Sequence, residues 1–78
     1  MWRRTHAEPG WSGAPTTVME FLVSQEEDEE QYEAVRIDGN ATGIVGTFPT
    51  AAEARDAADM VAAESHQCSD LCSAWEEA

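Results

Sequence analysis

Hydrophobic and polar residues alternate in the segment TTVMEFLVSQ, residues 16–25, and this pattern predicts a β-strand. Met19, Phe21 and Val23 fall on one face at a period of two, which is the repeat of side chains along a strand. The segment is also rich in β-branched and aromatic residues, which favour strands. We therefore expect its Met19–Phe21–Val23 face to be turned toward the core.

Two further strands are predicted in the sequence that follows. QYEAVRIDGN, residues 31–40, alternates through Val35 and Ile37, and Ile37 is a core candidate beside Phe21. The segment ends in a turn, because Gly and Asn tolerate the positive φ that tight hairpins require. ATGIVGTF, residues 41–48, is predicted as a third strand. Short connections between all three strands favour an antiparallel meander.

The segment FPTAAEARDAADMVAAESHQ carries the clearest helix signal in the chain. Thr50 followed by Glu53 is a capping box, and Pro49 just before it ends the preceding strand. The helix is predicted over residues 51–67. On a helical wheel the apolar face is formed by small residues, namely Ala51, Ala54, Ala57, Ala58, Val61 and Ala62. The predicted fold is α+β: a three-stranded antiparallel meander with one helix packed on one face, in the order β-β-β-α.

The segments on either side of this 16–67 domain show weaker patterns. Residues 1–15 contain Pro and Gly without periodicity, so we expect an extended N-terminal arm. Residues 68–78 are expected to form a C-terminal tail or a short helix. Trp2 and Trp11 lie in the arm, where they either pack against the domain or serve as anchors for a partner, since Trp is favoured at binding hot spots.

The charge of the chain limits the kinds of partner that it could have. Sixteen acidic residues stand against four basic ones, all arginine, for a formal net charge of −12. Direct binding to nucleic acid or to an anionic membrane needs a basic face, so this composition argues against both. No apolar run approaches the ~20 residues of a membrane span, and no signal peptide is seen, so a cytoplasmic location is expected.

The sequence contains no recognisable catalytic or cofactor-binding motif, and we expect a protein that is not an enzyme and holds no cofactor. The cluster His66-x-Cys68-x-x-x-Cys72 could contribute to a metal site. A structural zinc site needs four ligands, however, and His6 is remote in sequence. We expect no bound metal here and two reduced thiols, with a metal site or a disulfide as the alternatives.

The densest charge is the run Glu26, Glu27, Asp28, Glu29 and Glu30, between the first two predicted strands. A hairpin does not need such a run, because shorter Asn-Gly or Asp-Gly turns avoid its self-repulsion. We therefore expect the run to be the main contact with a basic partner. Asp56, Asp59 and Glu64 on the predicted helix would supply a second acidic contact, with Trp2 and Trp11 as apolar anchors.

With this run and the acidic helix AAEARDAADMVAAE, the chain resembles phage-encoded anti-CRISPR proteins of type I systems in size, charge and expected fold. The resemblance implies an inhibitor in the host cytoplasm that blocks the nucleic-acid site of a basic protein, such as the CRISPR surveillance complex. It implies no role for any single residue.

Two alternatives to this inhibitor remain. The charge could serve solvation in a domain from a salt-adapted organism or a GC-rich genome, or the chain could be an antitoxin-like neutraliser of one basic protein. A monomer or a weak dimer is expected.

Overall fold

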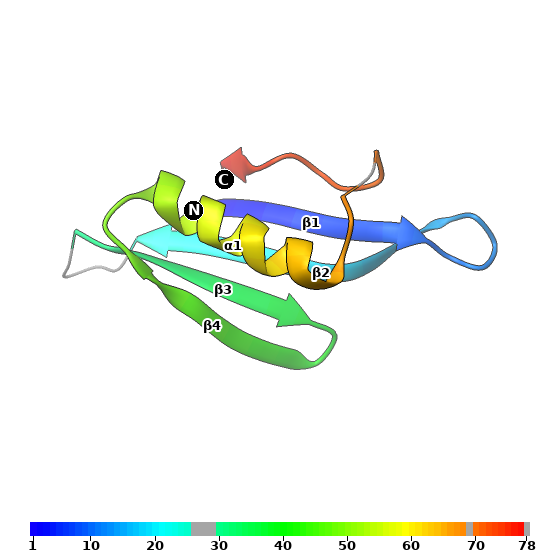
Figure 1. Ribbon diagram of the computed structural model, residues 1–78, viewed down its shortest axis with the longest axis horizontal. Coiled ribbons are helices and arrows are strands. Elements are labelled where there is room, and N and C mark those ends of the chain that lie inside the picture. The colour runs from blue at the N-terminus through cyan, green and yellow to red at the C-terminus, as the bar shows by residue number, and fades with distance from the viewer. Residues whose placement is uncertain (26–29, 69, 78) are drawn as a thin grey trace.

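The computed structural model describes residues 1–25, 30–68 and 70–77 and shows a five-stranded antiparallel sheet with one helix packed on it (Figure 1). The elements are β1 (Trp2–Pro9), β2 (Pro15–Gln25), β3 (Tyr32–Asp38), β4 (Ala41–Phe48), α1 (Ala51–Ser65) and β5 (Glu76–Glu77). Their order across the sheet is β4-β3-β2-β1-β5. The predicted α+β class, the meander of β2, β3 and β4, and the helix on one face are confirmed, while the sheet has two more strands than predicted.

The core lies between α1 and the inner face of the sheet. Phe21 and Val23 on β2 are fully buried, and Met19 is nearly so, as their alternation predicted. The helix meets them through Ala54, Ala58 and Ala62, which are also buried. Alanine side chains are short, so the helix lies close to the sheet and larger side chains at its margins fill the remaining space. These include Val45, Phe48, Val61 and Trp75.

The segment expected to be an extended N-terminal arm, residues 1–15, forms all of strand β1 and the turn that leads into β2. β1 pairs with β2 from Trp2 to Pro9 and with β5 at Trp2 and Arg3. Its pattern is hard to recognise because the side chains that face the helix are aromatic or polar instead of aliphatic. The register also shifts between His6 and Ala7, which marks a β-bulge.

The C-terminal segment forms no helix within its described residues, in contrast to the short helix considered from the sequence. The chain leaves α1 at His66, which caps the helix in an extended conformation, so α1 ends at Ser65 and is two residues shorter than predicted. The segment then returns along β1. The Ser73 backbone N–H donates to the Thr5 carbonyl, and the Ser73 hydroxyl accepts from the Thr5 N–H, both at 2.9 Å. Glu76 and Glu77 complete the sheet as β5.

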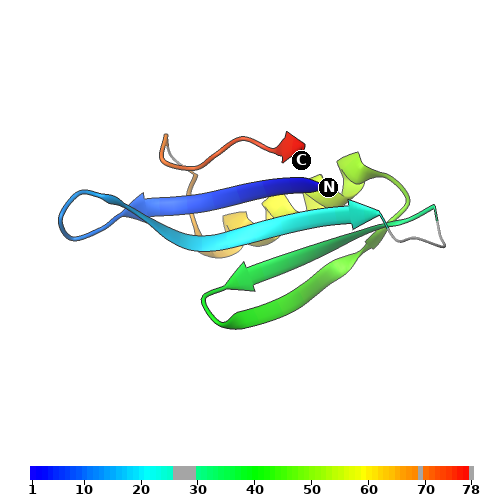
Figure 2. The same cartoon turned by 180° about the vertical axis from the view of Figure 1, so that it is seen from behind.

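The face of the sheet opposite α1 is not covered by any described element (Figure 2). Leu22, Val35 and Ile44 are neighbours across three strands on this face. Ile37, named beside Phe21 as a core candidate, pairs with Glu20 and so also lies on this face. The molecule is elongated, with extents of 45 × 22 × 22 Å. No helix among the described residues is long and apolar enough to cross a membrane.

Candidate metal centre

Four side chains with metal-binding atoms converge where β1 passes the C-terminal end of α1. His6 comes from β1, His66 caps the helix, and Cys68 and Cys72 belong to the segment that follows. Their ligand atoms all lie within 4.8 Å of one another. His6, which is remote from the others in sequence, is therefore not remote in space, and the structure supplies the fourth candidate ligand that the sequence spacing did not reveal.

Strand β1 points every second side chain toward α1 and the segment after it. Trp2 packs beside Val23 and Ala54, Arg4 reaches Asp59, and His6 and Glu8 both lie against His66. This is the period of two expected of a strand. The same alternation therefore builds the edge of the core at one end of β1 and the candidate site at the other.

His66 is fixed by contacts to both of its ring nitrogens. Nδ1 lies 2.8 Å from Oε1 of Glu8, and Nε2 lies 3.1 Å from Sγ of Cys72. A carboxylate can only accept, so Nδ1 carries the proton and donates it to Glu8. In the neutral ring, Nε2 then carries the lone pair and faces the sulfur of Cys72. Hydrogen bonding to Cys72 and to Glu8 raises the pKa of His66 from its ordinary value, and burial opposes this.

His6 is fully buried and is held between two other rings. It makes edge contacts with Phe21, at a centroid distance of 5.6 Å, and with His66, at 5.2 Å. Nδ1 lies 3.4 Å from Sγ of Cys68, while Nε2 has no hydrogen-bond partner among the described residues. Burial, followed by the charges of Arg4 and His66, lowers the pKa of His6. A neutral imidazole is the form that binds metal ions.

The two thiols lie in different surroundings. Cys68 is at the surface, where Nη2 of Arg4 approaches its sulfur to 3.5 Å. Loss of solvation raises the pKa of the Cys68 thiol, and the Arg4 charge acts in the opposite direction. Cys72 is half-buried, and its sulfur faces the Ala7 carbonyl at 3.7 Å as well as His66. Both sulfurs therefore face β1, where Cys68 lies against Arg4 and His6 and Cys72 lies against Ala7.

Two kinds of chemistry fit parts of this arrangement. Cys72, His66 and Glu8 form a row in which a thiol, an imidazole and an orienting carboxylate follow one another, as in nucleophilic catalysis by cysteine. That row leaves His6 and Cys68 unexplained. A metal ion uses all four donors at once, and two imidazoles with two thiolates are a common ligand set of structural zinc. The complete cluster therefore fits metal binding better than it fits catalysis.

The structure describes some of the residues predicted to contact a basic partner, and these differ in exposure and in their contacts. Glu26, Glu27, Asp28 and Glu29 lie outside the described residues. Glu30, Asp56 and Glu64 are exposed. Asp59, in contrast, accepts a hydrogen bond from Arg4 at 2.8 Å and from the Trp75 indole N–H at 3.1 and 3.2 Å, so its carboxylate serves the fold.

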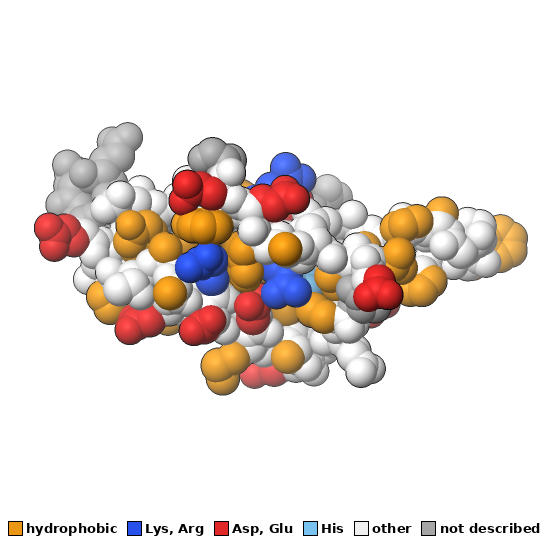
Figure 3. Space-filling model, turned by 90° about the horizontal axis from the view of Figure 1, so that it is seen from above, with side chains coloured by type: hydrophobic (Ala, Val, Ile, Leu, Met, Phe, Trp, Pro, Cys, Tyr) orange, Lys and Arg blue, Asp and Glu red, His pale blue; other side chains and the backbone are white. Residues whose placement is uncertain are grey.

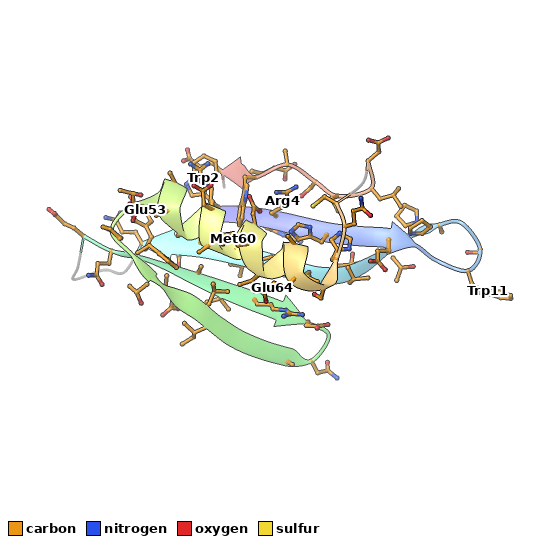
Figure 4. The ribbon with its side chains drawn as sticks, in the orientation of Figure 1. Trp2, Arg4, Trp11, Glu53, Met60 and Glu64 are labelled. Atoms are coloured by element: carbon orange, nitrogen blue, oxygen red, sulfur yellow. The ribbon has the colours of Figure 1, made fainter. Side chains whose placement is uncertain are left out.

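The two predicted tryptophan anchors differ in their exposure and in where they lie in the molecule. Trp2 is half-buried beneath the guanidinium of Arg55, which lies 4.1 Å from the ring centroid. Trp11 is fully exposed at the tip of the β1–β2 hairpin, at the far end of the molecule from Glu53 (Figure 4). The two side chains therefore cannot act as neighbouring anchors in one contact.

Comparison of the chain with protein-family models, with curated proteins and with solved structures finds no significant match. Its function is therefore inferred from its own residues. The site residues that sequence reasoning missed are His6, as a partner of the 66–72 cluster, and Glu8. The signal that could have found them is the spacing of two between them, which places both on one face of a strand once residues 2–9 are recognised as one.

Proposed function

We propose that this protein is a non-enzymatic acidic binding domain that covers the nucleic-acid-binding surface of a basic partner protein. One observation carries the proposal: each of the four basic side chains is engaged by the chain itself. Arg3 pairs with Glu20, Arg4 with Asp59 and Arg36 with Asp38, at 3.1, 2.8 and 3.2 Å, and Arg55 stacks on Trp2. The charge left for a partner is therefore negative.

The outer face of α1 is the described surface that best suits such a contact. Glu53, Asp56 and Glu64 are all exposed on it, and Glu53 and Glu64 lie near opposite ends of the helix (Figure 4). They are eleven residues apart, which is about 16 Å at ~1.5 Å per residue. This row is much sparser than the phosphates of a duplex, which carry one charge per ~1.7 Å. It would speed association and select a basic partner more than it would set the affinity.

Affinity needs an apolar contact beside these charges. Met60 on α1 is 72% exposed, and it lies between Asp56 and Glu64 along the helix. Methionine adapts to irregular surfaces because its side chain is flexible and polarizable. We take Met60 as the apolar anchor in place of Trp2, because Trp2 packs beside Val23 and is stacked against Arg55. A type I anti-CRISPR protein, the resemblance drawn from the sequence, is one form that such an inhibitor would take.

The test is binding to a basic nucleic-acid-binding protein from candidate hosts, measured with and without competing duplex DNA at ~0.15 M salt. The triple variant E53Q/D56N/E64Q should weaken binding, and duplex DNA should displace the parent protein. The matched control is D70N/E76Q/E77Q, which removes the same charge from exposed positions away from the helix. Equal binding by both variants would contradict a role for α1. A third variant with glutamine at 26–30 tests the acid run separately.

The spread of carboxylates favours a second candidate function. Acidic side chains are scattered over the side of the molecule seen in Figure 3, with arginines between them, instead of gathering in one patch. This distribution suits a protein whose charge maintains solvation in a salty medium. In that case stability should rise continuously up to molar salt, and no basic protein should be displaced from the domain by DNA.

A further inference from the structure

The donor set and its surroundings point to a specific ligand that does not depend on the proposed function. We propose that His6, His66, Cys68 and Cys72 bind a structural Zn²⁺ ion between β1 and the segment that follows α1. A chain that bound no basic partner could still bind this ion. The two assays also share no readout, so either proposal can fail alone.

The spacing of the donor atoms is close to what a tetrahedral zinc ion needs. Bond lengths of ~2.3 Å to sulfur and ~2.0–2.1 Å to nitrogen place neighbouring ligand atoms about 3.3–3.8 Å apart. Two of the nitrogen–sulfur distances are 3.1 Å, from His66 Nε2 to Cys72, and 3.4 Å, from His6 Nδ1 to Cys68. All four donors lie within 4.8 Å of one another. Small side-chain movements are enough to place an ion between them.

Glu8 supports the assignment because it occupies the position of an outer partner. Zinc-bound histidines usually donate their second N–H to a carboxylate or a carbonyl, which fixes the ring and makes it a better ligand. Nδ1 of His66 makes this contact with Glu8 at 2.8 Å, and Nε2 is the nitrogen that faces the other donors. The ring is thus oriented for metal binding.

His6 supplies an independent reason to expect a ligand. Its ring is fully buried, and its Nδ1 faces the other donors at 3.4 Å from the Cys68 sulfur, which is a weak hydrogen-bond partner. A bond from the imidazole to a metal ion would compensate for the burial of the ring. A surface cluster of carboxylates, which is common without any ion, has no such buried donor.

Charge and coordination both favour zinc in a structural role. Two thiolates balance the ion while two neutral imidazoles complete its shell, and Arg4 adds a donor at 3.5 Å from the Cys68 sulfur. Since protein atoms fill all four positions, no open position remains for a substrate. The ion would join β1 to the segment that carries Ser73 and Trp75, and so fasten the last strand to the sheet.

The experiment uses the full chain, freed of metal with a chelator and titrated with Co²⁺ and then with Zn²⁺. Co²⁺ accepts the same tetrahedral ligands and gives thiolate-to-metal absorption that reports sulfur ligation. We expect saturation at about one ion per chain, displacement by Zn²⁺, a higher Tm, and protection of both thiols from alkylation. The C68S variant, altered at an exposed position, should lose most of the affinity and part of the thiolate absorption, since Cys72 remains.

The control is D70N, which removes an exposed carboxylate from the same segment and should bind like the parent. Circular dichroism of metal-free C68S separates loss of a ligand from loss of folding. The proposal is overturned if Co²⁺ gives no thiolate bands, or if C68S and D70N bind zinc equally, which would assign the metal to surface carboxylates. It is also overturned if Zn²⁺ leaves alkylation unchanged and Cys72 alone reacts rapidly, because the row of Cys72, His66 and Glu8 would then be a nucleophilic centre.

Discussion

Nη1 of Arg4 on β1 donates a 2.8 Å hydrogen bond to the Asp59 carboxylate on α1, and this ion pair joins the strand to the helix beside the candidate metal centre. The pair is partly shielded, with side-chain exposures of 19% and 36%. Asp59 also accepts from the Trp75 indole, and the Arg4 Nε donates to the Ser73 carbonyl. One carboxylate thus connects β1, α1 and the C-terminal segment.

Replacing Asp59 by Asn should therefore destabilise the protein by about 1–3 kcal/mol, since Arg4 and Trp75 lose a charged acceptor. Urea unfolding followed by circular dichroism measures the change. D56N is the matched control, because Asp56 is exposed on the same helix. If the two variants unfold at the same urea concentration, the contacts of Asp59 with Arg4 and Trp75 do not contribute to stability.

Phe21 to Ala should cost ~3–5 kcal/mol, because the side chain is fully buried in the middle of the core. The change could prevent folding in so small a domain. I37A is the comparison, since Ile37 lies on the uncovered face and should cost far less. Thermal melts of both variants test which face of the sheet is packed against the helix. A larger loss of stability for I37A would mean that the face carrying Ile37 is the buried one.

Thr50 to Ala should cost ~1 kcal/mol through loss of the helix cap. The Thr50 hydroxyl accepts a 3.2 Å hydrogen bond from the Glu53 backbone N–H, as the capping box predicted. A Ser at the same position keeps the acceptor, so T50S should retain most of the stability. An unchanged melting curve for T50A would show that this contact contributes nothing.

Gly39 to Ala should cost ~1 kcal/mol, because Gly39 has φ of +62° in the β3–β4 turn and L-residues are strained there. The space around it is open, so the cost comes from the backbone and not from a clash. Gly43 on β4 is the control: its surroundings are also open, and its φ is not positive. G43A should therefore be tolerated, and equal losses for both variants would argue against backbone strain.

Glu8 to Gln should weaken Zn²⁺ binding about 10–100-fold, because the amide is a poorer outer partner for His66 than the carboxylate. Competition with a chromophoric chelator measures the affinity. The stoichiometry should stay the same, since all four ligands remain. E64Q, an exposed change on α1, controls for the loss of one negative charge. Equal affinities of E8Q and E64Q for Zn²⁺ would show that Glu8 does not support metal binding through His66.

The parts of the fold that the sequence predicted correctly have local signals. Alternation marks β2, the Gly39 turn joins β3 to β4, and the Thr50 cap and alanine face define α1. β1 lacks such a signal because the face it turns to the helix carries Trp, Arg, His and Glu. Each of these finds its partner only through the fold, far along the chain.

The candidate metal centre could not be predicted for the same reason. Cys68 and His6 are 62 residues apart, and no local pattern reports that they meet. The 66–72 cluster was visible in the sequence, but its spacing offered only three ligands. The fourth depended on β1 lying in the sheet beside the end of the helix. The acidic positions were visible too, yet the use of Asp59 inside the fold follows from its contact with Arg4.

The two edges of the sheet differ, and this difference limits how copies of the chain could join. β5 and the Ser73 contacts cover the outer side of β1, whereas the outer side of β4 pairs with no strand among the described residues. Unpaired edges are where strands of other chains add. Two copies that met through β4 would leave only the two-residue strand β5 at each outer edge, and this offers little backbone for a further strand to pair with. Such an edge permits a closed pair and opposes an endless fibre.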